Sequence, residues 1–324
     1  MVGARDPELV RPPFDRQGRS FRTLRLSLTP VCNFACRYCD PESSPGKEPV
    51  PITRRPADFY LRLVERLLEV TPLHTVRLTG GEPTLYAQLA SLVAGLAALG
   101  LSRICLTTNG FLLESQLEAL KAAGLTDLNV SVDAIEPAVF ERVTGRGGLD
   151  RVLGAIDRAR GLALPLKINA TIMRGLNDCQ VLPVFEQFAA AGIEVRFLEL
   201  MKMGPLQTNH EQFFFSEAEI LARICERFTV RRLERQPSAT ATLFETGDGR
   251  RFGIIANHSA PFCSDCDRLR LDHEGRLFGC LSSAIGYTVP DDKHALIATL
   301  KGALEEKQPQ RFTGSALSMR SIGG

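Results

Sequence analysis

The feature that most constrains the fold of this 324-residue chain is a regular alternation of β-rich runs and amphipathic stretches between residues 22 and 200. Runs such as TVRLTG and LKINATI have the length of a strand, whereas ADFYLRLVERLLEV repeats its apolar residues with a helical period. Strands that alternate with helices form right-handed βαβ units, and these build a parallel sheet. Strands are predicted at 23–29, 75–80, 103–108, 127–133, 166–172 and 194–200, and helices at 57–70, 86–100 and 181–192.

Six such units can form an open doubly wound sheet or a curved, incomplete (β/α) barrel. In both arrangements the active site lies at the carboxyl ends of the strands. Polar residues stand where four of the strands end, at 79–82, 107–110, 131–133 and Asn169. We therefore expect these residues to converge on one rim of the sheet.

The pattern changes after residue 200, where shorter elements replace the alternation. A helix is predicted at 216–228, and short strands are predicted near 229–234, 240–246 and 251–256. The sequence DHEGR (272–276) is typical of a hairpin turn, and a last helix is predicted at 293–307. The chain is therefore predicted to contain an α/β part at 1–215 and a C-terminal α+β region at 216–324.

Composition and charge argue against several classes of function. The formal net charge of +2 does not indicate a protein that binds nucleic acid or a membrane surface. No apolar run approaches the roughly 18 residues of a membrane span, and the first residues lack the apolar segment of a signal peptide. We therefore expect a cytoplasmic, reducing location, where the nine cysteines are metal ligands or buried thiols rather than disulfides.

Three cysteines follow the first predicted strand with the spacing Cys-x3-Cys-x2-Cys, namely Cys32, Cys36 and Cys39. Zinc normally takes four protein ligands, or three and a water, and a thioredoxin-like site needs only Cys-x2-Cys, which leaves Cys32 without a role. Three thiolates can instead hold a 4Fe–4S cluster and leave one iron open for another ligand. The spacing therefore favours an iron–sulfur cluster over three incidental buried cysteines.

A second group of three, Cys263, Cys266 and Cys280, also has no evident fourth cysteine. A zinc ribbon is the alternative here, because His258 or His273 could complete four ligands. The other three cysteines are predicted to be small buried apolar residues: Cys105, Cys179 and Cys225.

Charged residues in the predicted strands point towards an anionic substrate. Arg77 and Lys167 lie within strands, where an isolated charge is costly unless it is paired. Arg268 and Arg270 alternate with leucines, so both guanidinium groups should project from one face. One such arginine is more simply a surface charge or the partner of a carboxylate, but several near one cavity favour phosphate, which arginine binds through paired hydrogen bonds.

The first cysteine motif resembles that of the radical S-adenosylmethionine (SAM) superfamily, in which an aromatic residue, here Tyr38, precedes the third cysteine. TGGEP (79–83) strengthens the resemblance, since glycines let a backbone approach a ligand closely. Along nearly its whole length the chain is similar to the GTP 3′,8-cyclase family of molybdenum cofactor biosynthesis. The segments that carry this similarity are LRLSLTPVCNFACRYC, VRLTGGEP, LTTNG, NVSVDA, VRFLEL, CDRLRLDHEGRLFGCL and the final Gly-Gly.

This resemblance implies an incomplete (β/α)6 TIM-type barrel whose C-terminal α+β region carries a second iron–sulfur cluster. Two 4Fe–4S clusters are implied, with SAM on the first and GTP on the second, held respectively by Cys32, Cys36, Cys39 and by Cys263, Cys266, Cys280. The implied SAM contacts are Tyr38, Gly81, Ser131 and Met201. The implied GTP contacts are Arg25, Arg77, Thr107, Lys167, Arg268, Leu269 and Arg270, and the implied catalytic residues are Gly323 and Gly324.

The implied activity is that of a lyase converting GTP to 3′,8-cyclo-7,8-dihydro-GTP, begun by SAM cleavage and hydrogen abstraction from ribose C3′. The implied partners are an external electron donor, the downstream cyclic pyranopterin monophosphate synthase and a second copy of the chain. Two alternatives stay open at this point. One is another radical SAM enzyme with an auxiliary cluster that acts on a peptide, and the other is a non-catalytic iron–sulfur or zinc protein.

Overall fold

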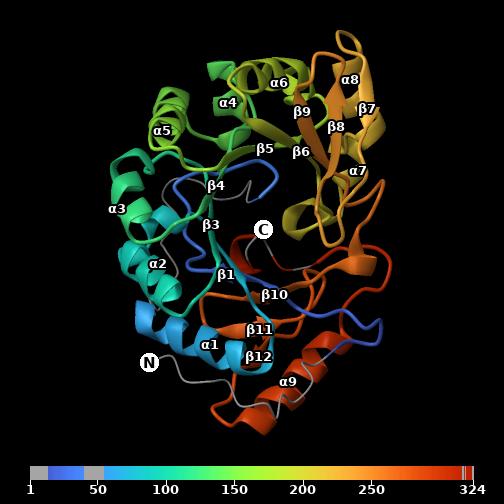
Figure 1. Ribbon diagram of the computed structural model, residues 1–324. Helices are drawn as coiled ribbons and strands as arrows, with labels where there is room; N and C mark the ends of the chain where they lie inside the picture. Colours follow the sequence, from blue (N-terminus) through green and yellow to red (C-terminus); the bar gives the residue numbers. More distant parts are fainter. Residues whose placement is uncertain (1–13, 40–54, 316, 318, 323–324) are drawn as a thin grey trace.

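The computed structural model describes residues 14–39, 55–315, 317 and 319–322 (Figure 1). The described strands belong to one mixed sheet in the order β12-β11-β10-β1-β2-β3-β4-β5-β6-β9-β8-β7. Their bounds are β1 Thr23–Ser27, β2 Thr75–Thr79, β3 Arg103–Thr108, β4 Asp127–Ser131, β5 Leu166–Ile172, β6 Glu194–Glu199, β7 Val230–Arg232, β8 Thr242–Thr246, β9 Arg251–Ile255, β10 Arg268–Leu271, β11 Arg276–Phe278 and β12 Tyr287–Thr288.

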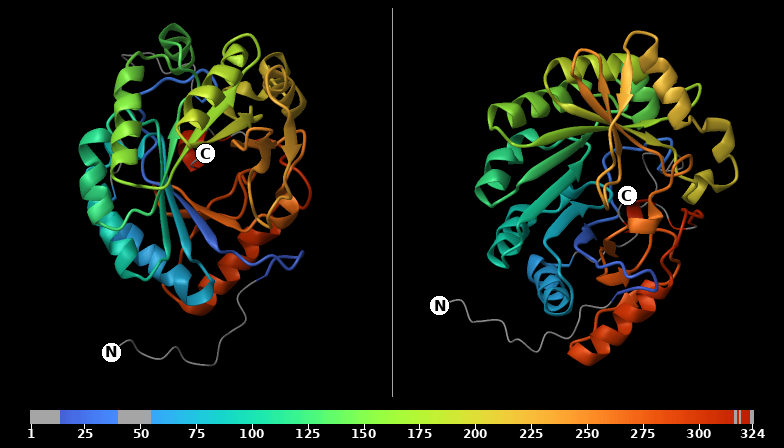
Figure 2. Two further views of the ribbon diagram at one scale, coloured as in Figure 1. Left: turned by 45° about the horizontal axis from the view of Figure 1, so that its top comes forward. Right: turned by 45° about the vertical axis from the view of Figure 1, so that its right-hand side comes forward.

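Helices α1 to α6 cover the outer face of this sheet and follow the strands in the order that βαβ units require (Figures 1 and 2). Their bounds are α1 Ala57–Val70, α2 Leu89–Ala98, α3 Leu117–Ala122, α4 Pro137–Thr144, α5 Leu149–Gly161, α6 Val181–Ala190, α7 His210–Phe213, α8 Glu217–Cys225, α9 Lys293–Glu305 and α10 Met319–Ile322. Short 3-10 helices lie at Pro83–Leu85, Glu114–Gln116, Asp178–Gln180, Gly204–Gln207 and Cys263–Asp265.

The prediction of six parallel strands separated by helices is confirmed, and most boundaries agree within two residues. The sequence did not show where the later strands would go. β9 pairs in parallel with β6, and β10 pairs in parallel with β1, so the C-terminal region extends both edges of the same sheet. Eight consecutive parallel strands, from β10 to β9, therefore curve around the interior in the described part of the chain (Figure 2).

Alternation along the strands separates the core from the interior of the barrel. In β1, Leu24 and Leu26 are fully buried against the helices, and Arg25 between them faces the other way, into the cavity described below. The same alternation places Val76 and Leu78 in the core and Arg77 in the interior. The apolar face of each strand packs on helices such as α1, so the polar face lines an enclosed space.

The C-terminal region is joined to this barrel rather than standing beside it. The chain leaves β9 at one edge of the parallel strands and reaches β10 at the other edge; Cys263 and Cys266 lie along that connection, and Cys280 follows β11. Helix α10 packs against β1 on the concave side of the sheet (Figure 1). The division at 215/216 therefore stays a prediction about function, since one sheet continues across it.

Candidate active site

The interior of the barrel carries a row of like charges. Arg25 on β1 is in register with Arg77 on one side and with Arg270 on the other. Like charges directly opposite each other destabilise a sheet. An anion bound beside this row of three guanidinium groups would stabilise it.

Arg25 and Arg77 line a polar cavity of about 690 Å³. Two carboxylates, Asp265 and Asp267, also line it, and Glu194 on β6 accepts hydrogen bonds from Lys167 at 3.0 Å and from Arg196 at 2.7 Å. Cations still outnumber the carboxylates that lie beside them. The cationic lining consists of Arg19, Arg22, Arg25, Arg77, Arg103, Lys167, Arg196 and Arg268.

Burial and mutual repulsion disfavour the charged form of several of these groups. Burial lowers the pKa of Arg25 well below its usual value, and the charges of Arg270 and Arg77 lower it further. Burial, followed by the charge of Arg268, lowers the pKa of Arg270 to about 10. Because a nearby anion favours the charged form, the cavity is electrostatically suited to a polyphosphate.

Three polar atoms at this site are buried without a hydrogen-bond partner among the described residues: Arg25 Nε, Thr107 Oγ1 and Asn169 Oδ1. A buried donor or acceptor that stays unpaired costs about 1–3 kcal/mol. All three residues line the cavity. The cavity therefore offers both donors and an acceptor to a polar ligand.

Four cavity cations were not among the residues singled out from the sequence, namely Arg19, Arg22, Arg103 and Arg196. Arg196 could have been found, because Val195 and Phe197 on either side of it are buried in the core and alternation directs Arg196 inward. Arg103 begins β3 and pairs with Asp127, so nothing in its local sequence distinguishes it from a surface residue.

The first cysteine group lies in the loop after β1, and neighbouring elements fix this loop firmly. The amide of Ala35 donates to the carbonyl of Thr144 at 2.8 Å, and Phe34 packs edge-on against Phe111 and Phe140. Arg320 from α10 donates to the carbonyl of Phe34 at 2.7 Å. Contacts from α4 and from the C-terminal helix therefore hold the loop in place.

Burial raises the pKa of the Cys32 thiol to about 11 and raises that of Cys36 well above its usual value. Thiols in such a site stay protonated until a metal centre supplies positive charge, so metal binding must release protons. After burial, the charges of Asp133, Cys39 and Cys32 raise the pKa of Cys36 further.

The four residues that the resemblance assigns to SAM all follow or end strands at the same rim. Tyr38 lies in the loop after β1, Gly81 follows β2, Ser131 ends β4 and Met201 follows β6. The Tyr38 hydroxyl donates to Asp133 Oδ2 at 2.9 Å, and Asp133 Oδ1 accepts from the amide of Thr171 at 2.8 Å. The arginine row lies deeper, towards the amino ends of the strands, so the site extends through the barrel rather than along the rim alone.

Gly81 is required by a close contact within the protein itself. Its amide donates to the carbonyl of Thr29 at 2.5 Å, and a Cβ at this position would overlap the carbonyl oxygen of Val31, at the start of the cysteine loop. The next residue, Glu82, is buried and accepts hydrogen bonds from Thr108 Oγ1 at 2.5 Å and from the amide of Asn109 at 2.8 Å. The TGGEP segment therefore ties the cysteine loop to β3.

Gly81→Ala is expected to lower the free energy of unfolding by about 1–3 kcal/mol, as overpacking typically does, and to reduce iron loading at the first cysteine group. Gly161→Ala is the matched control, because a Cβ there meets no atom within 4 Å. Thermal unfolding and iron analysis of both variants check the prediction. Equal behaviour of the two would contradict it.

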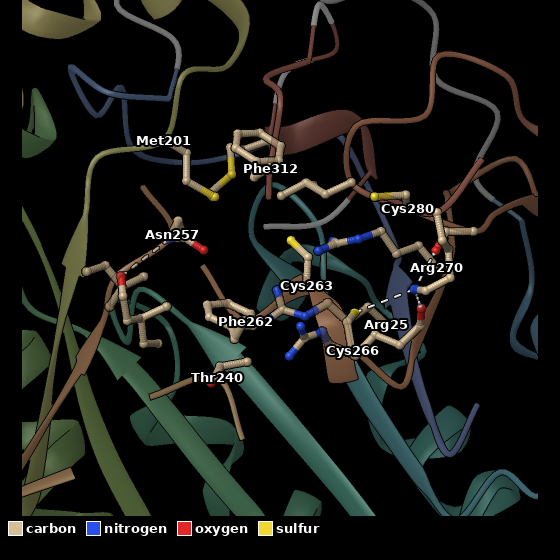
Figure 3. Close-up of a pocket in the computed structure, with 17 residues that line it drawn as sticks. Arg25, Met201, Thr240, Asn257, Phe262, Cys263, Cys266, Arg270, Cys280 and Phe312 are labelled. Atoms are coloured by element: carbon tan, nitrogen blue, oxygen red, sulfur yellow. Dashed lines mark hydrogen bonds between the residues drawn. The ribbon is translucent and has the colours of Figure 1, made fainter. Parts of the chain in front are cut away.

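The second cysteine group surrounds a cavity of about 120 Å³, which is smaller than the cationic cavity and adjoins it (Figure 3). Cys263, Cys266 and Cys280 line it together with Arg25 and Arg270, and the figure shows these side chains directed to a shared space. Both cavities are lined by Arg25 and Arg268, so the cysteines and the cationic row belong to one continuous site.

Buried cations act on the thiols of this group. Burial alone would raise the pKa of Cys266, but the charges of Arg268 and Lys307 outweigh it and lower the pKa to about 6. The pKa of Cys263 is instead raised to about 11 by burial. Sequence reasoning missed Lys307, because an isolated lysine just after a helix carries no local signal.

Three thiols are a donor set of the kind that holds an iron–sulfur cluster. Among the described residues, no group of three or more His, Cys, Asp or Glu side chains converges closely enough to hold one ion. In a four-iron cube each thiolate binds a different iron, so the sulfurs need not meet at one point. His258 stacks on His210 with ring centroids 5.3 Å apart, which argues against its acting as the fourth zinc ligand.

The remaining predicted residues have varied places. The side chain of Leu269 is fully buried in the core, so β10 presents only Arg268 and Arg270 to the cavities. Gly323 and Gly324 lie outside the described residues. The prediction of burial is right for Cys105 but wrong for Cys179 and Cys225, which are exposed because each occupies the outer side of a short helical segment.

Comparisons with known proteins agree with this geometry. The family model described as the radical SAM superfamily matches residues 26–188, and the model described as Molybdenum Cofactor Synthesis C matches residues 193–313. A protein of Synechococcus sp. (strain WH7803) named GTP 3′,8-cyclase is 38% identical over 97% of this chain and 99% of its own length. A protein of Corynebacterium glutamicum (strain ATCC 13032) with the same name is 36% identical over 96% of this chain and 89% of its own.

Among solved structures, Streptococcus suis SuiB bound to S-adenosylmethionine matches with a TM-score of 0.64 at 13% identity, over 89% of this chain and 68% of SuiB. SuiB bound to the precursor peptide SuiA matches equally well at 14% identity, over 89% of this chain and 67% of SuiB. At these identities the likeness supports the fold alone. None of the helices in the described part of the chain combines the length and apolarity needed to cross a membrane.

Proposed function

Since this chain belongs to the GTP 3′,8-cyclase family of the radical SAM superfamily, we propose that it converts GTP to 3′,8-cyclo-7,8-dihydro-GTP in molybdenum cofactor biosynthesis. The observation that carries the proposal is the row Arg270–Arg25–Arg77, which joins a cationic cavity to the second cysteine group. A nucleoside triphosphate has the matching chemistry, since one end is strongly anionic and the other is a planar base.

The cationic cavity would bind the triphosphate. Arg77, Lys167 and Arg196 project into it from three strands, and guanidinium groups pair with phosphate oxygens through two hydrogen bonds. Arg25 and Arg268 line both cavities, so they would lie beside the middle of the substrate. Fixing both ends of the nucleotide would orient the ribose towards the SAM rim, which is how an enclosed site reduces the entropic part of a barrier.

The residues at the rim would hold the cofactors. Membership of the superfamily implies one 4Fe–4S cluster and SAM. We propose Cys32, Cys36 and Cys39 as the ligands of that cluster, and the SAM contacts named above for the cofactor. When bound, the cluster and SAM supply the one-electron chemistry of the reaction. The described residues would keep this chemistry away from water, since Phe34 and the TGGEP segment pack around the loop.

We also propose a second 4Fe–4S cluster at Cys263, Cys266 and Cys280, with an open iron for the guanine base. The proximity of Arg25, Arg268 and Arg270 supports this assignment, because an iron–sulfur cluster with three thiolates carries net negative charge. The physiological electron donor, the downstream cyclic pyranopterin monophosphate synthase and a homodimer stay predictions of the family resemblance.

An anaerobic assay tests the function directly. Purified protein with reconstituted clusters is incubated with dithionite, SAM and GTP, and we expect 5′-deoxyadenosine together with a cyclised purine nucleotide. ATP in place of GTP is the control and should give no cyclised product. SAM cleavage without consumption of GTP would overturn the substrate assignment while leaving the superfamily membership intact.

Arg77→Met is expected to raise the KM for GTP about ten- to a hundred-fold, because a hydrogen bond to a charged group contributes roughly 1.5–3 kcal/mol. The melting temperature of the ligand-free protein should not fall, since the substitution removes one of three adjacent like charges. Arg231→Met is the matched control, as Arg231 is exposed on β7 at the far edge of the sheet. Steady-state kinetics with equal KM values for both variants would contradict the prediction.

A further inference from the structure

Lys307, just beyond the end of α9, is a buried cation that the proposed reaction does not use. Only 7% of its surface is exposed. Its ammonium group donates to the carbonyl of Arg268 at 2.9 Å, to the carbonyl of Gly279 at 2.9 Å and to Cys266 Sγ at 3.5 Å. It also lies 4.9 Å from the centre of the Phe21 ring.

These contacts satisfy the lysine, and no carboxylate in the described part of the chain pairs with it. An ammonium group has three donors, and three acceptors are in place. Two of these acceptors are neutral carbonyls, which do not compensate most of the positive charge of the ammonium group. Burying such a charge is costly unless it is paired, and Cys266 Sγ, as a thiolate, is the anion within reach.

The same contacts join the two chain segments that carry the second cysteine group. Arg268 begins β10 two residues after Cys266, and Gly279 directly precedes Cys280. The position of Lys307 is itself fixed, because a Cβ on Gly279 would overlap the carbonyl oxygen of Ala303 in α9. Helix α9 therefore packs directly against the turn before Cys280 and presents Lys307 to both segments.

Cys263, the remaining cysteine of the group, is held by a different cation. Arg19 donates to the carbonyl of Cys263 and, at 3.2 Å, to the carbonyl of Gln308, the residue after Lys307. Arg19 is in turn paired with Asp15, and both side chains are buried. Unlike Lys307, Arg19 has a carboxylate partner and contacts a carbonyl rather than a sulfur. Arg268, like Lys307, places positive charge beside the Cys266 sulfur.

We infer that Lys307 is a positioning residue for the second cluster: its ammonium group holds Cys266 and Cys280 at the spacing that the cluster needs, and its charge stabilises the reduced cluster. The inference rests on the proposed function, which places a cluster at this group. A hydrogen bond and a positive charge at a ligating sulfur raise the reduction potential of an iron–sulfur centre. Lys307 would thus keep the second cluster easier to reduce than three thiolates alone would allow.

The test compares Lys307→Met and Lys307→Arg with Lys301→Met, a control that removes an exposed lysine from the same helix. Each full-length protein is reconstituted anaerobically, its iron is counted, and the potential of the second cluster is followed by electron paramagnetic resonance during a redox titration. We expect Lys307→Met either to lose about half of its iron or to show a more negative second-cluster potential, Lys307→Arg to recover most of the difference, and Lys301→Met to match the wild type.

Two results would overturn the inference. In one, Lys307→Met retains full iron with an unchanged potential. In the other, Lys307→Arg fails to recover what Lys307→Met loses, so that the charge has no role of its own. Failure of the proposed function would be seen in the wild type rather than in the variants, because the wild type would then load only about four irons instead of about eight.

Discussion

Cys36→Ser is expected to abolish SAM cleavage, with a loss of more than about a thousand-fold, which corresponds to about 4 kcal/mol or more of barrier. Cys36 is the middle cysteine of the loop after β1, and burial raises the pKa of its thiol well above the usual value. A hydroxyl in its place is a poor ligand for iron, so the cluster would lose one of its three protein ligands. Formation of 5′-deoxyadenosine under anaerobic, reducing conditions is the measurement.

The chain supplies a control of the same residue type. Cys179 is exposed on a 3-10 helix outside both cysteine groups, and Cys179→Ser should retain wild-type SAM cleavage and iron content. Cys36→Ser should retain the iron of the second group, because the two groups lie on separate segments. If Cys36→Ser cleaved SAM at the wild-type rate, the first group would not be the site of the radical SAM cluster.

Deletion of Gly323 and Gly324 is expected to abolish formation of the cyclised product while leaving iron content and SAM cleavage in place. The residues just before them are anchored inside the barrel: Ile322 is 1% exposed, its carbonyl accepts from Arg270 at 3.4 Å, and Met319 lines the cavity of the second cysteine group. The last described residues therefore lie beside that cavity. Glycine has no Cβ, so two of them can occupy a crowded space and adopt backbone angles that other residues avoid.

Product analysis and 5′-deoxyadenosine formation should be measured on the same samples, because their ratio separates the two steps. Gly323→Ala together with Gly324→Ala tests whether the absence of side chains matters, and we expect product formation to fall by at least about tenfold. Full cyclisation activity of the truncated protein would contradict a catalytic role of the two glycines.

The motifs identified from the sequence depend on local information. The spacing of Cys32, Cys36 and Cys39 is a property of one loop, and the alternation of strands and helices is a property of neighbouring residues. Both the cysteine spacing and the alternation can be recognised in the sequence, because ligand geometry and side-chain periodicity depend on residues only a few positions apart. The same locality explains why Arg25 and Arg77 could be placed on strands but not beside each other.

Burial of single residues was less predictable. Cys105 and Cys225 both stand in apolar-looking stretches, yet one is buried in β3 and the other is exposed at the end of α8. Periodicity shows which face a residue occupies, but whether another element covers that face depends on packing from elsewhere in the chain. Leu269 shows the same limit, since its side chain faces the core although both neighbouring arginines face the substrate cavities.

By itself, the sequence determined the six βα units, the two cysteine groups and the family to which the chain belongs. The tertiary structure alone decided that β9 and β10 extend opposite edges of one sheet, that Arg270, Arg25 and Arg77 form a continuous row, and that Lys307 reaches Cys266. The physical reason is that strand order and register arise from hydrogen bonds between segments far apart in the chain. Residue spacing records what a segment needs locally, whereas the charge row and the buried lysine exist only once those distant segments pair.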